Sequence, residues 1–149
     1  HLGSMVKACR CSPDQVARYQ AKLSGPLLDR IDLQVEVPAL PPDVLMQAGA
    51  GESTATVRAR CAQAHARALA RQGTNNQGLQ GQALEAHVRL GPDESLFLQT
   101  TAHKLGWSSR STHRVLRVAR TIADLAEAAH VGIPHLAEAV QYRRVLVAQ

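Results

Sequence analysis

The chain has 149 residues, 45% of them apolar, and a formal net charge of +5. That length is enough for one domain with a real core, and because only 3% of the residues are aromatic, Ala, Leu, Val and Ile must build that core, which favours closely packed helices. The sequence has no apolar run long enough to span a membrane and no signal-peptide pattern, and its three cysteines form no disulfide framework. These absences exclude membrane-spanning proteins and secreted proteins held by disulfides. A cytoplasmic protein is therefore expected.

The chain opens on two features that lie outside any expected helix. Residues 1–5 read like the remnant of an expression tag, so we expect a fragment and leave them out of the fold. Cys9 and Cys11 follow at C-x-C spacing, which can supply half of a tetrahedral zinc site. A structural site needs four ligands, and neither Cys61 nor the histidines show ligand spacing. We therefore expect no metal site within this chain. Cys9 and Cys11 are either half of a zinc site in the whole protein or two free thiols.

The next stretch predicts a helix from Ser12 to about Leu23. Ser at the N-cap, Pro at the first helical position and Gln at the capping-box position are typical of a helix start. A turn follows, in which two leucines precede Asp29 and Arg30, and Asp29 can orient the guanidinium of Arg30. An arginine held in this way can stabilise the charge that develops in phosphoryl transfer. The alternative from spacing alone is a surface ion pair worth at most about 1 kcal/mol.

Residues 31–37 show the one clear strand pattern, because apolar and polar residues alternate along them. A strand needs partners, and no other segment offers an equally clear one. We therefore expect an edge strand, or a strand from a sheet whose other members lie elsewhere. Without those members, the segment should be disordered, folded against the helical part, or paired with another copy of itself.

The run CRCSPDQVARYQAKLSGPLLDRIDLQVEVP, residues 9–38, closely resembles the end of the ATPase module in the magnesium-chelatase-like AAA+ family. That family includes ComM-like competence proteins and the ATPase subunit of magnesium chelatase. The resemblance continues to Tyr142-Arg143-Arg144 and so covers nearly the whole chain. It implies that Arg30, in the LLDR motif, is an arginine finger and that Asp29 orients it.

Three parts of the family's pattern are missing from this sequence. The P-loop motif G-x-x-x-x-G-K-[ST] and the acidic Walker B strand are absent, so this chain alone should not bind or hydrolyse ATP competently. The second cysteine pair that would complete a four-cysteine cluster with Cys9 and Cys11 is absent too. ATP and Mg²⁺ are therefore expected as cofactors of the whole protein, and none is expected in the fragment.

Residues 39–52 are rich in Pro and Gly and predict a linker, with one short helical turn before Gln47. From Ser53 to Arg71 the pattern predicts a long Ala-rich helix. Its apolar face carries Val57, Cys61, Ala64 and Ala68, and its basic face carries Arg60, Arg67 and Arg71. The basic face can contact DNA phosphates or a neighbouring subunit, and a solvated helix face is the alternative.

One loop and four helices complete the pattern. Residues 73–81 form a polar loop, the best candidate for local disorder. Helices are expected at about 82–88, from Asp93 to Gly106, from Trp107 to Leu125, and from near Ile133. The apolar stripes expected to be buried are Leu98, Ala102 and Leu105; Val115, Val118, Ala119, Ile122 and Leu125; and Ile133, Leu136, Ala137 and Val140. His135 is expected to cap or pack, and Arg143 and Arg144 to complement the end of the last helix.

The helix over 107–125 carries arginines at spacings of four and three, namely Arg110, Arg114 and Arg117. Arg110 falls in the first turn, where its charge opposes the helix dipole unless an anion is bound. The family resemblance assigns this place to the sensor 2 arginine, which contacts the terminal phosphate of ATP in its own or a neighbouring subunit. Arg114 and Arg117 are second candidates, and Arg120 is expected to pair with Asp124 one turn later.

These patterns together predict a mainly α protein. We expect residues 6–38 to be the end of an α/β ATPase core, with one helix and a single strand, and residues 53–149 to be a helical AAA+ lid of about five helices. The resemblance implies a homo-oligomeric ring of six subunits that acts on DNA as a branch-migration helicase, or one that drives metal insertion into a porphyrin. A free-standing basic helical module that binds nucleic acid is the alternative from another class.

Overall fold

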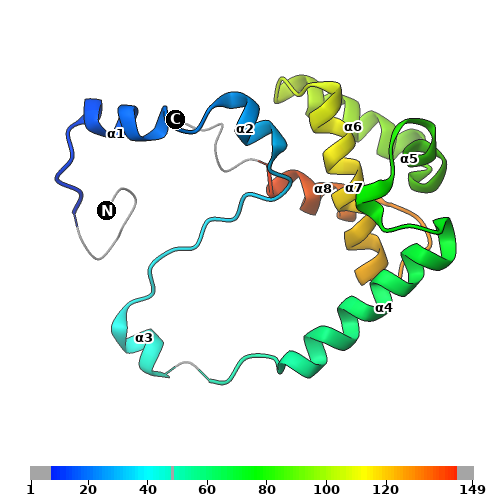
Figure 1. The fold of residues 1–149 in the computed structure, drawn as a ribbon, viewed down its shortest axis with the longest axis horizontal. Coiled ribbons are helices and arrows are strands. Elements are labelled where there is room, and N and C mark those ends of the chain that lie inside the picture. The colour runs from blue at the N-terminus through cyan, green and yellow to red at the C-terminus, as the bar shows by residue number, and fades with distance from the viewer. Residues whose placement is uncertain (1–7, 48, 144–149) are drawn as a thin grey trace. The chain divides into compact units, whose positions relative to one another are not determined.

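A computed structural model describes residues 8–47 and 49–143. Within these residues the chain forms eight α-helices and one 3₁₀ turn and contains no strand (Figure 1). The predicted mainly α class is confirmed. The proposed tag remnant, residues 1–5, and Arg144 lie outside the described residues. The chain divides into two compact units, which are treated separately: the described residues of His1–Ile31 with Val35–Gly51, and those of Asp32–Gln34 with Glu52–Gln149.

The first unit holds three short helices, α1 (Pro13–Gln20), α2 (Gly25–Arg30) and α3 (Pro42–Gln47). The predicted capping box at the start of α1 is present, and Ser24 caps α2 by accepting a hydrogen bond from the backbone of Leu27 at 3.3 Å. Two details of the prediction are wrong. The first helix ends at Gln20, and the turn that carries Arg30 is itself a helix. None of these three helices buries a residue.

The strand predicted for residues 31–37 does not form in the structure. A strand is stabilised by a hydrogen-bonded neighbour, and the described residues offer none. Val35 and Val37 are 63% and 84% exposed. The short piece Asp32–Gln34 instead belongs to the helical unit, where the backbone N–H of Gln34 donates to the carbonyl oxygen of Tyr142 at 2.8 Å. Folding against the helical part is thus the outcome for these three residues.

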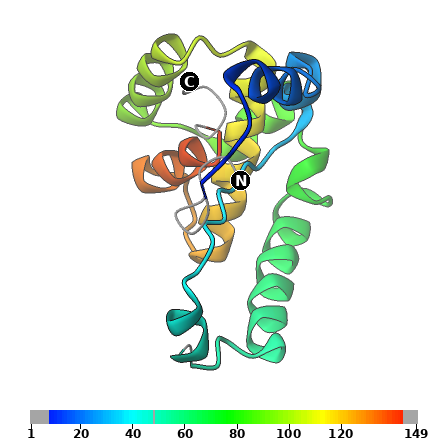
Figure 2. The same cartoon turned by 90° about the vertical axis from the view of Figure 1, so that its left-hand side faces the viewer.

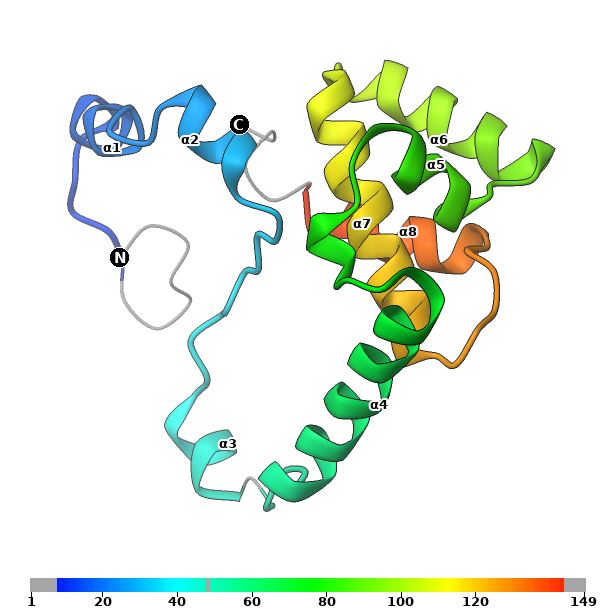
Figure 3. The ribbon, with the colours of Figure 1, turned by 45° about the vertical axis from the view of Figure 1, so that its right-hand side comes forward.

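The helical unit contains the five α-helices predicted for this part of the chain, with bounds within two residues of those expected. They are α4 (Thr54–Gln72), α5 (Gly81–Val88), α6 (Pro92–Lys104), α7 (Ser109–Leu125) and α8 (Ile133–Gln141), with the 3₁₀ turn η1 (Asn76–Gly78) after α4. α7 contacts α4, η1, α5 and α8, and α6 packs on α8 (Figure 3). None of the described helices has both the length and the apolar character needed to cross a membrane. α7 is therefore the element around which the others pack.

The core lies along α7 and is aliphatic, as the composition predicted. Its buried members include Leu84, Val88, Val115, Ala119, Ala123 and Leu136, each at most 2% exposed. The expected stripes are only partly correct, because Leu125 and Ile133 remain 37% and 39% exposed. Of the stripe on α6, only Leu98 is buried.

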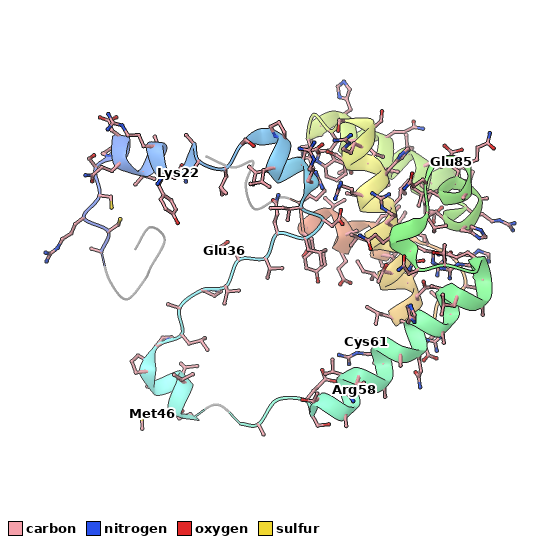
Figure 4. The ribbon with its side chains drawn as sticks, in the orientation of Figure 1. Lys22, Glu36, Met46, Arg58, Cys61 and Glu85 are labelled. Atoms are coloured by element: carbon pink, nitrogen blue, oxygen red, sulfur yellow. The ribbon has the colours of Figure 1, made fainter. Side chains whose placement is uncertain are left out.

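Only the C-terminal half of α4 packs against the unit. Ala64 and Ala68 are buried, whereas Cys61, predicted to be on the buried face, is exposed. The N-terminal half extends past the other helices of this unit in both Figure 2 and Figure 3. Figure 4 shows Arg58 and Cys61 on this protruding half. The apolar face predicted for α4 is therefore longer than the part of the helix that packs against other helices.

The loop over 73–81, predicted to be disordered, is held by Asn76, which is 8% exposed. The Asn76 amide donates to the Asp124 carboxylate at 2.8 Å and to the Thr121 hydroxyl at 3.0 Å. Its carbonyl oxygen accepts from Arg71 at 2.9 Å and from Gln72 at 3.0 Å. The Asn76 amide is buried and has hydrogen-bond partners for both its donor and its acceptor atoms, so it orders the loop. The polar composition of the loop does not predict this order.

A buried ion cluster joins the ends of α4 and α7. Arg120 and Asp124 are 1% and 2% exposed and bond at 3.0 Å, which confirms the predicted pair. Arg71 adds a second guanidinium, 2.5 Å from the same carboxylate. Arg120 also donates to the carbonyl oxygens of Ala128 and Ala129. These contacts close the turn between α7 and α8.

The basic face of α4 forms ion pairs with carboxylates of the same unit. Arg60 pairs with Glu52 at 2.9 Å, and Arg67 pairs with Glu127 at 2.6 Å. Together with Arg71 on Asp124, all three predicted arginines have carboxylate partners. The Arg60 and Arg67 pairs remain partly exposed, at 49% and 35% of these two side chains, so contact with DNA phosphates or with a neighbouring subunit stays a prediction for this face.

Candidate functional site

The proposed finger lies at the end of α2. Ser24 at the N-cap and Pro26 in the first turn start this helix, and Arg30 is its last residue. The Arg30 side chain is exposed and donates through Nη1 to the carbonyl oxygen of Pro26 at 3.1 Å. Asp29 beside it is half-buried. The short helix thus presents the guanidinium at its C-terminal end, where a cation suits the helix dipole.

The proposed sensor 2 residue lies at the N-terminal end of a helix. Ser108 caps α7 by accepting from the backbone N–H of Ser111 at 3.2 Å, and Arg110 is the second residue of the helix. Arg110 is exposed and has no hydrogen bond or ion pair with any residue of 8–47 or 49–143. Its charge opposes the partial positive charge of the helix start. None of the described residues supplies an anion at this position.

The other arginines of α7 are engaged by protein groups. Arg114, whose side chain is 17% exposed, forms an ion pair with Asp32. Arg117 donates to the carbonyl oxygen of Leu79 at 3.2 Å. Arg120 lies in the buried cluster with Asp124. The two second candidates for phosphate contact, Arg114 and Arg117, are therefore already used within the unit.

A residue that sequence reasoning placed elsewhere supports the first turn of α7. Arg143 was expected to complement the end of α8, but it is 8% exposed and donates to the Ser111 hydroxyl at 3.0 Å. Ser111 is 5% exposed and also accepts from the Ser108 hydroxyl at 3.2 Å. The turn that carries Arg110 is thus fixed from the far end of the unit.

His135 caps α8, as predicted for a structural histidine. Its Nδ1 accepts a hydrogen bond from the backbone N–H of Gly132 at 3.0 Å. This contact occupies the ring nitrogen that faces the helix start. The geometry gives His135 a local structural role at the N-terminus of α8.

The two N-terminal cysteines remain close to each other. Cys9 is half-buried and Cys11 is exposed. Hydrogen bonds from the backbone and then the thiol of Cys11 lower the pKa of Cys9, and the same contact with Cys9 raises the pKa of Cys11. Among the described residues, no three His, Cys, Asp or Glu side chains gather as a metal site would need.

The chain matches two family models. The model described as magnesium chelatase, subunit ChlI C-terminal, matches residues 51–143, and the model described as magnesium chelatase, subunit ChlI, matches residues 1–45. Residues 46–50, between the two matches, lie within the segment predicted to be a linker.

Curated proteins resemble the chain over most of its length. It is 45% identical over 137 residues to the uncharacterized protein YifB of Salmonella typhimurium and 42% identical over 138 residues to the competence protein ComM of Haemophilus influenzae. It is 41% identical over 137 residues to the uncharacterized protein YifB of Escherichia coli. These alignments cover 91% to 92% of this chain and 27% of each relative, so the chain spans about a quarter of their length.

Proposed function

The chain belongs to the magnesium chelatase subunit ChlI family, and on that basis we propose that it supplies two arginines to ATP hydrolysis in a ring-shaped AAA+ motor. Arg30 acts as the arginine finger with Asp29 as its neighbour, and Arg110 acts as sensor 2. In this proposal residues 6–38 are the C-terminal end of the ATPase core, residues 39–52 are the linker, and residues 53–149 form the lid.

One observation carries this assignment: α7 leaves one of its four arginines without a protein partner in the described chain. Arg114, Arg117 and Arg120 each bond to a group of the unit, and Arg110 does not. A cation in the first turn of a 17-residue helix is electrostatically unfavourable until an anion joins it. A phosphate there would meet both the guanidinium and the free N–H groups of the helix start.

The chain's own residues account for only part of a nucleotide site. ATP bound in the whole protein would supply the phosphate to be transferred. Arg110 fits a contact to a phosphate oxygen, because its guanidinium is exposed and the turn that holds it is fixed by Ser111 and Arg143. This sequence contains no P-loop motif, so the Mg²⁺ ligands are assigned to other parts of the whole protein.

Replacing Arg110 by alanine in the whole protein tests the sensor 2 assignment. We expect the rate of ATP hydrolysis to fall by about 10²-fold, because a preorganised donor to the phosphate is lost. Steady-state phosphate release measures the effect. Arg58→Ala is the matched control, because it removes an equal charge from the exposed half of α4. Wild-type turnover in Arg110→Ala would disprove the assignment.

We propose DNA as the motor's substrate in preference to a metal-insertion partner. The LSGPLLDRIDLQVEV form is closer to the ComM-like branch of the family, and the chain is 42% identical to a competence protein. Homo-oligomeric ring assembly is part of the same proposal. The structure gives less support to a free-standing nucleic-acid-binding module, because Arg60, Arg67 and Arg71 are paired with carboxylates.

The pairing of this basic face leads to a prediction for the isolated chain. We expect it to bind duplex DNA with a dissociation constant weaker than about 10⁻⁵ M at physiological salt, because paired guanidiniums release few counterions. Fluorescence anisotropy across a range of salt concentrations measures both affinity and salt slope. Tight binding with a slope steeper than about −4 in log K against log salt would favour the free-standing module.

A further inference from the structure

We propose that Asp32 and Arg114 are positioning residues that hold the segment after Arg30 on α7, so that the finger and sensor 2 of one chain respond to nucleotide together. This inference rests on the proposed function and adds the coupling between its two arginines. The segment concerned is residues 32–34. It belongs to the helical unit, whereas the residues directly before and after it belong to the first unit.

The first attachment is the ion pair between Asp32 and Arg114. Arg114 is one helical turn after Arg110 on α7, and its side chain is 17% exposed against 43% for Asp32. The pair joins residues 82 positions apart, so it is a tertiary contact. Because the Arg114 side chain is mostly withdrawn from water, its ion pair with Asp32 is screened less by solvent than a pair on the surface. The attachment is therefore more than a surface ion pair.

The second attachment uses the backbone. The N–H of Gln34 donates to the carbonyl oxygen of Tyr142, which is the C-cap residue of α8. The next residue, Arg143, donates to Ser111 in the first turn of α7. The end of α8 thus bonds both to the segment 32–34 and to the turn that carries Arg110. Two separate routes connect this segment to the start of α7.

The covalent chain extends this connection to the finger. Only two peptide bonds separate Arg30 from Asp32, a span of at most about 7 Å between Cα atoms. A shift of α7 on phosphate binding at Arg110 moves Asp32 and is passed along the backbone to Arg30. This holds whichever subunit's nucleotide Arg110 contacts. Asp32 and Arg114 act through other residues and need not touch the nucleotide themselves.

Hydrogen exchange of the 149-residue chain tests the attachment directly. The Gln34 amide is the reporter, because its hydrogen bond to Tyr142 depends on the segment staying docked. We expect Asp32→Ala and Arg114→Ala each to speed its exchange by about tenfold, with amides of Ala119 and Ala123 in the core changed by less than about twofold. Arg67→Ala is the control, because it breaks another ion pair of this unit. Unchanged Gln34 exchange in both variants would overturn the proposal.

Kinetics of the whole protein test the coupling. We expect Arg114→Ala to lower kcat by about tenfold and to lower the Hill coefficient for ATP, with KM changed little. The reversed pair, Asp32→Arg with Arg114→Asp, should recover most of both losses, which general destabilisation would not allow. Wild-type kcat and Hill coefficient in Arg114→Ala, with activity lost in Arg30→Ala and Arg110→Ala, would overturn the coupling alone. Full activity in Arg30→Ala and Arg110→Ala would overturn the proposed function and the coupling with it.

Discussion

Arg30→Ala in the whole protein is expected to lower ATP hydrolysis by about 10³-fold or more, the effect typical of losing an arginine finger. The finger stabilises charge that develops on the transferred phosphoryl group, so kcat should fall while the affinity for ATP changes little. Arg30→Lys should recover little of the rate, because an ammonium group cannot reproduce the planar fork of a guanidinium. Steady-state kinetics with a fluorescent ATP analogue for affinity give both quantities.

Arg18→Ala is the matched control for this prediction, because Arg18 lies in the last turn of α1 and is exposed. A mixing experiment shows whether the finger acts across a subunit boundary. Subunits carrying Arg30→Ala should regain hydrolysis when mixed with subunits that keep Arg30 but cannot bind ATP. Wild-type turnover in Arg30→Ala alone would contradict the assignment of the finger.

Asp124→Ala is expected to destabilise the helical unit by about 3–5 kcal/mol, because it removes the carboxylate that two guanidiniums share. Arg120 is 1% exposed, so its charge would be left in a buried site, and Asn76 would lose the acceptor that orders its loop. For a unit of this size the midpoint of thermal unfolding should fall by at least about 12 °C. Thermal and denaturant unfolding followed by circular dichroism measure the loss.

Glu85→Ala is the control for that change, because Glu85 is an exposed acid on α5 (Figure 4). We expect it to change the free energy of unfolding by less than about 0.5 kcal/mol. Equal effects of the two substitutions would contradict a structural role for the buried cluster.

The same carboxylate predicts how stability depends on pH. Burial raises the pKa of Asp124, but hydrogen bonds from Arg71 and Asn76 and the charges of Arg120 and Arg71 outweigh it and hold the pKa below its usual value. Because the folded pKa is depressed, this contribution is fully present above the unfolded pKa of about 4 and is lost as pH falls through the folded value. Acid unfolding of the wild type should therefore show a loss of stability below about pH 4 that is smaller in Asp124→Ala.

The strand predicted for residues 31–37 shows where local pattern misleads. Alternation of apolar and polar residues records which side chains would share a face, but a strand also needs a hydrogen-bonded neighbour. The described chain has none, so Val37 is 84% exposed and only Asp32–Gln34 is held, by contacts to α7 and α8. The pattern could not predict which partner was available.

The helices themselves followed from the sequence because their causes are local. Ser12 and Ser108 cap helices, His135 caps α8, and Arg120 bonds to Asp124 one turn away. Each of these interactions spans four residues or fewer, so helix periodicity alone brings the groups together. The family, the aliphatic core and the candidate residues Arg30 and Arg110 were likewise accessible from the sequence.

Only the tertiary structure decided which arginines have partners. Arg71 meets Asp124 across 53 positions, Arg114 meets Asp32 across 82, and Arg143 meets Ser111 across 32. Contacts at such separations depend on how α4, α7 and α8 pack, and no local spacing encodes that packing. Sequence therefore determined the helices and offered several arginines for phosphate contact, and packing left Arg110 as the α7 arginine without a protein partner in the described chain.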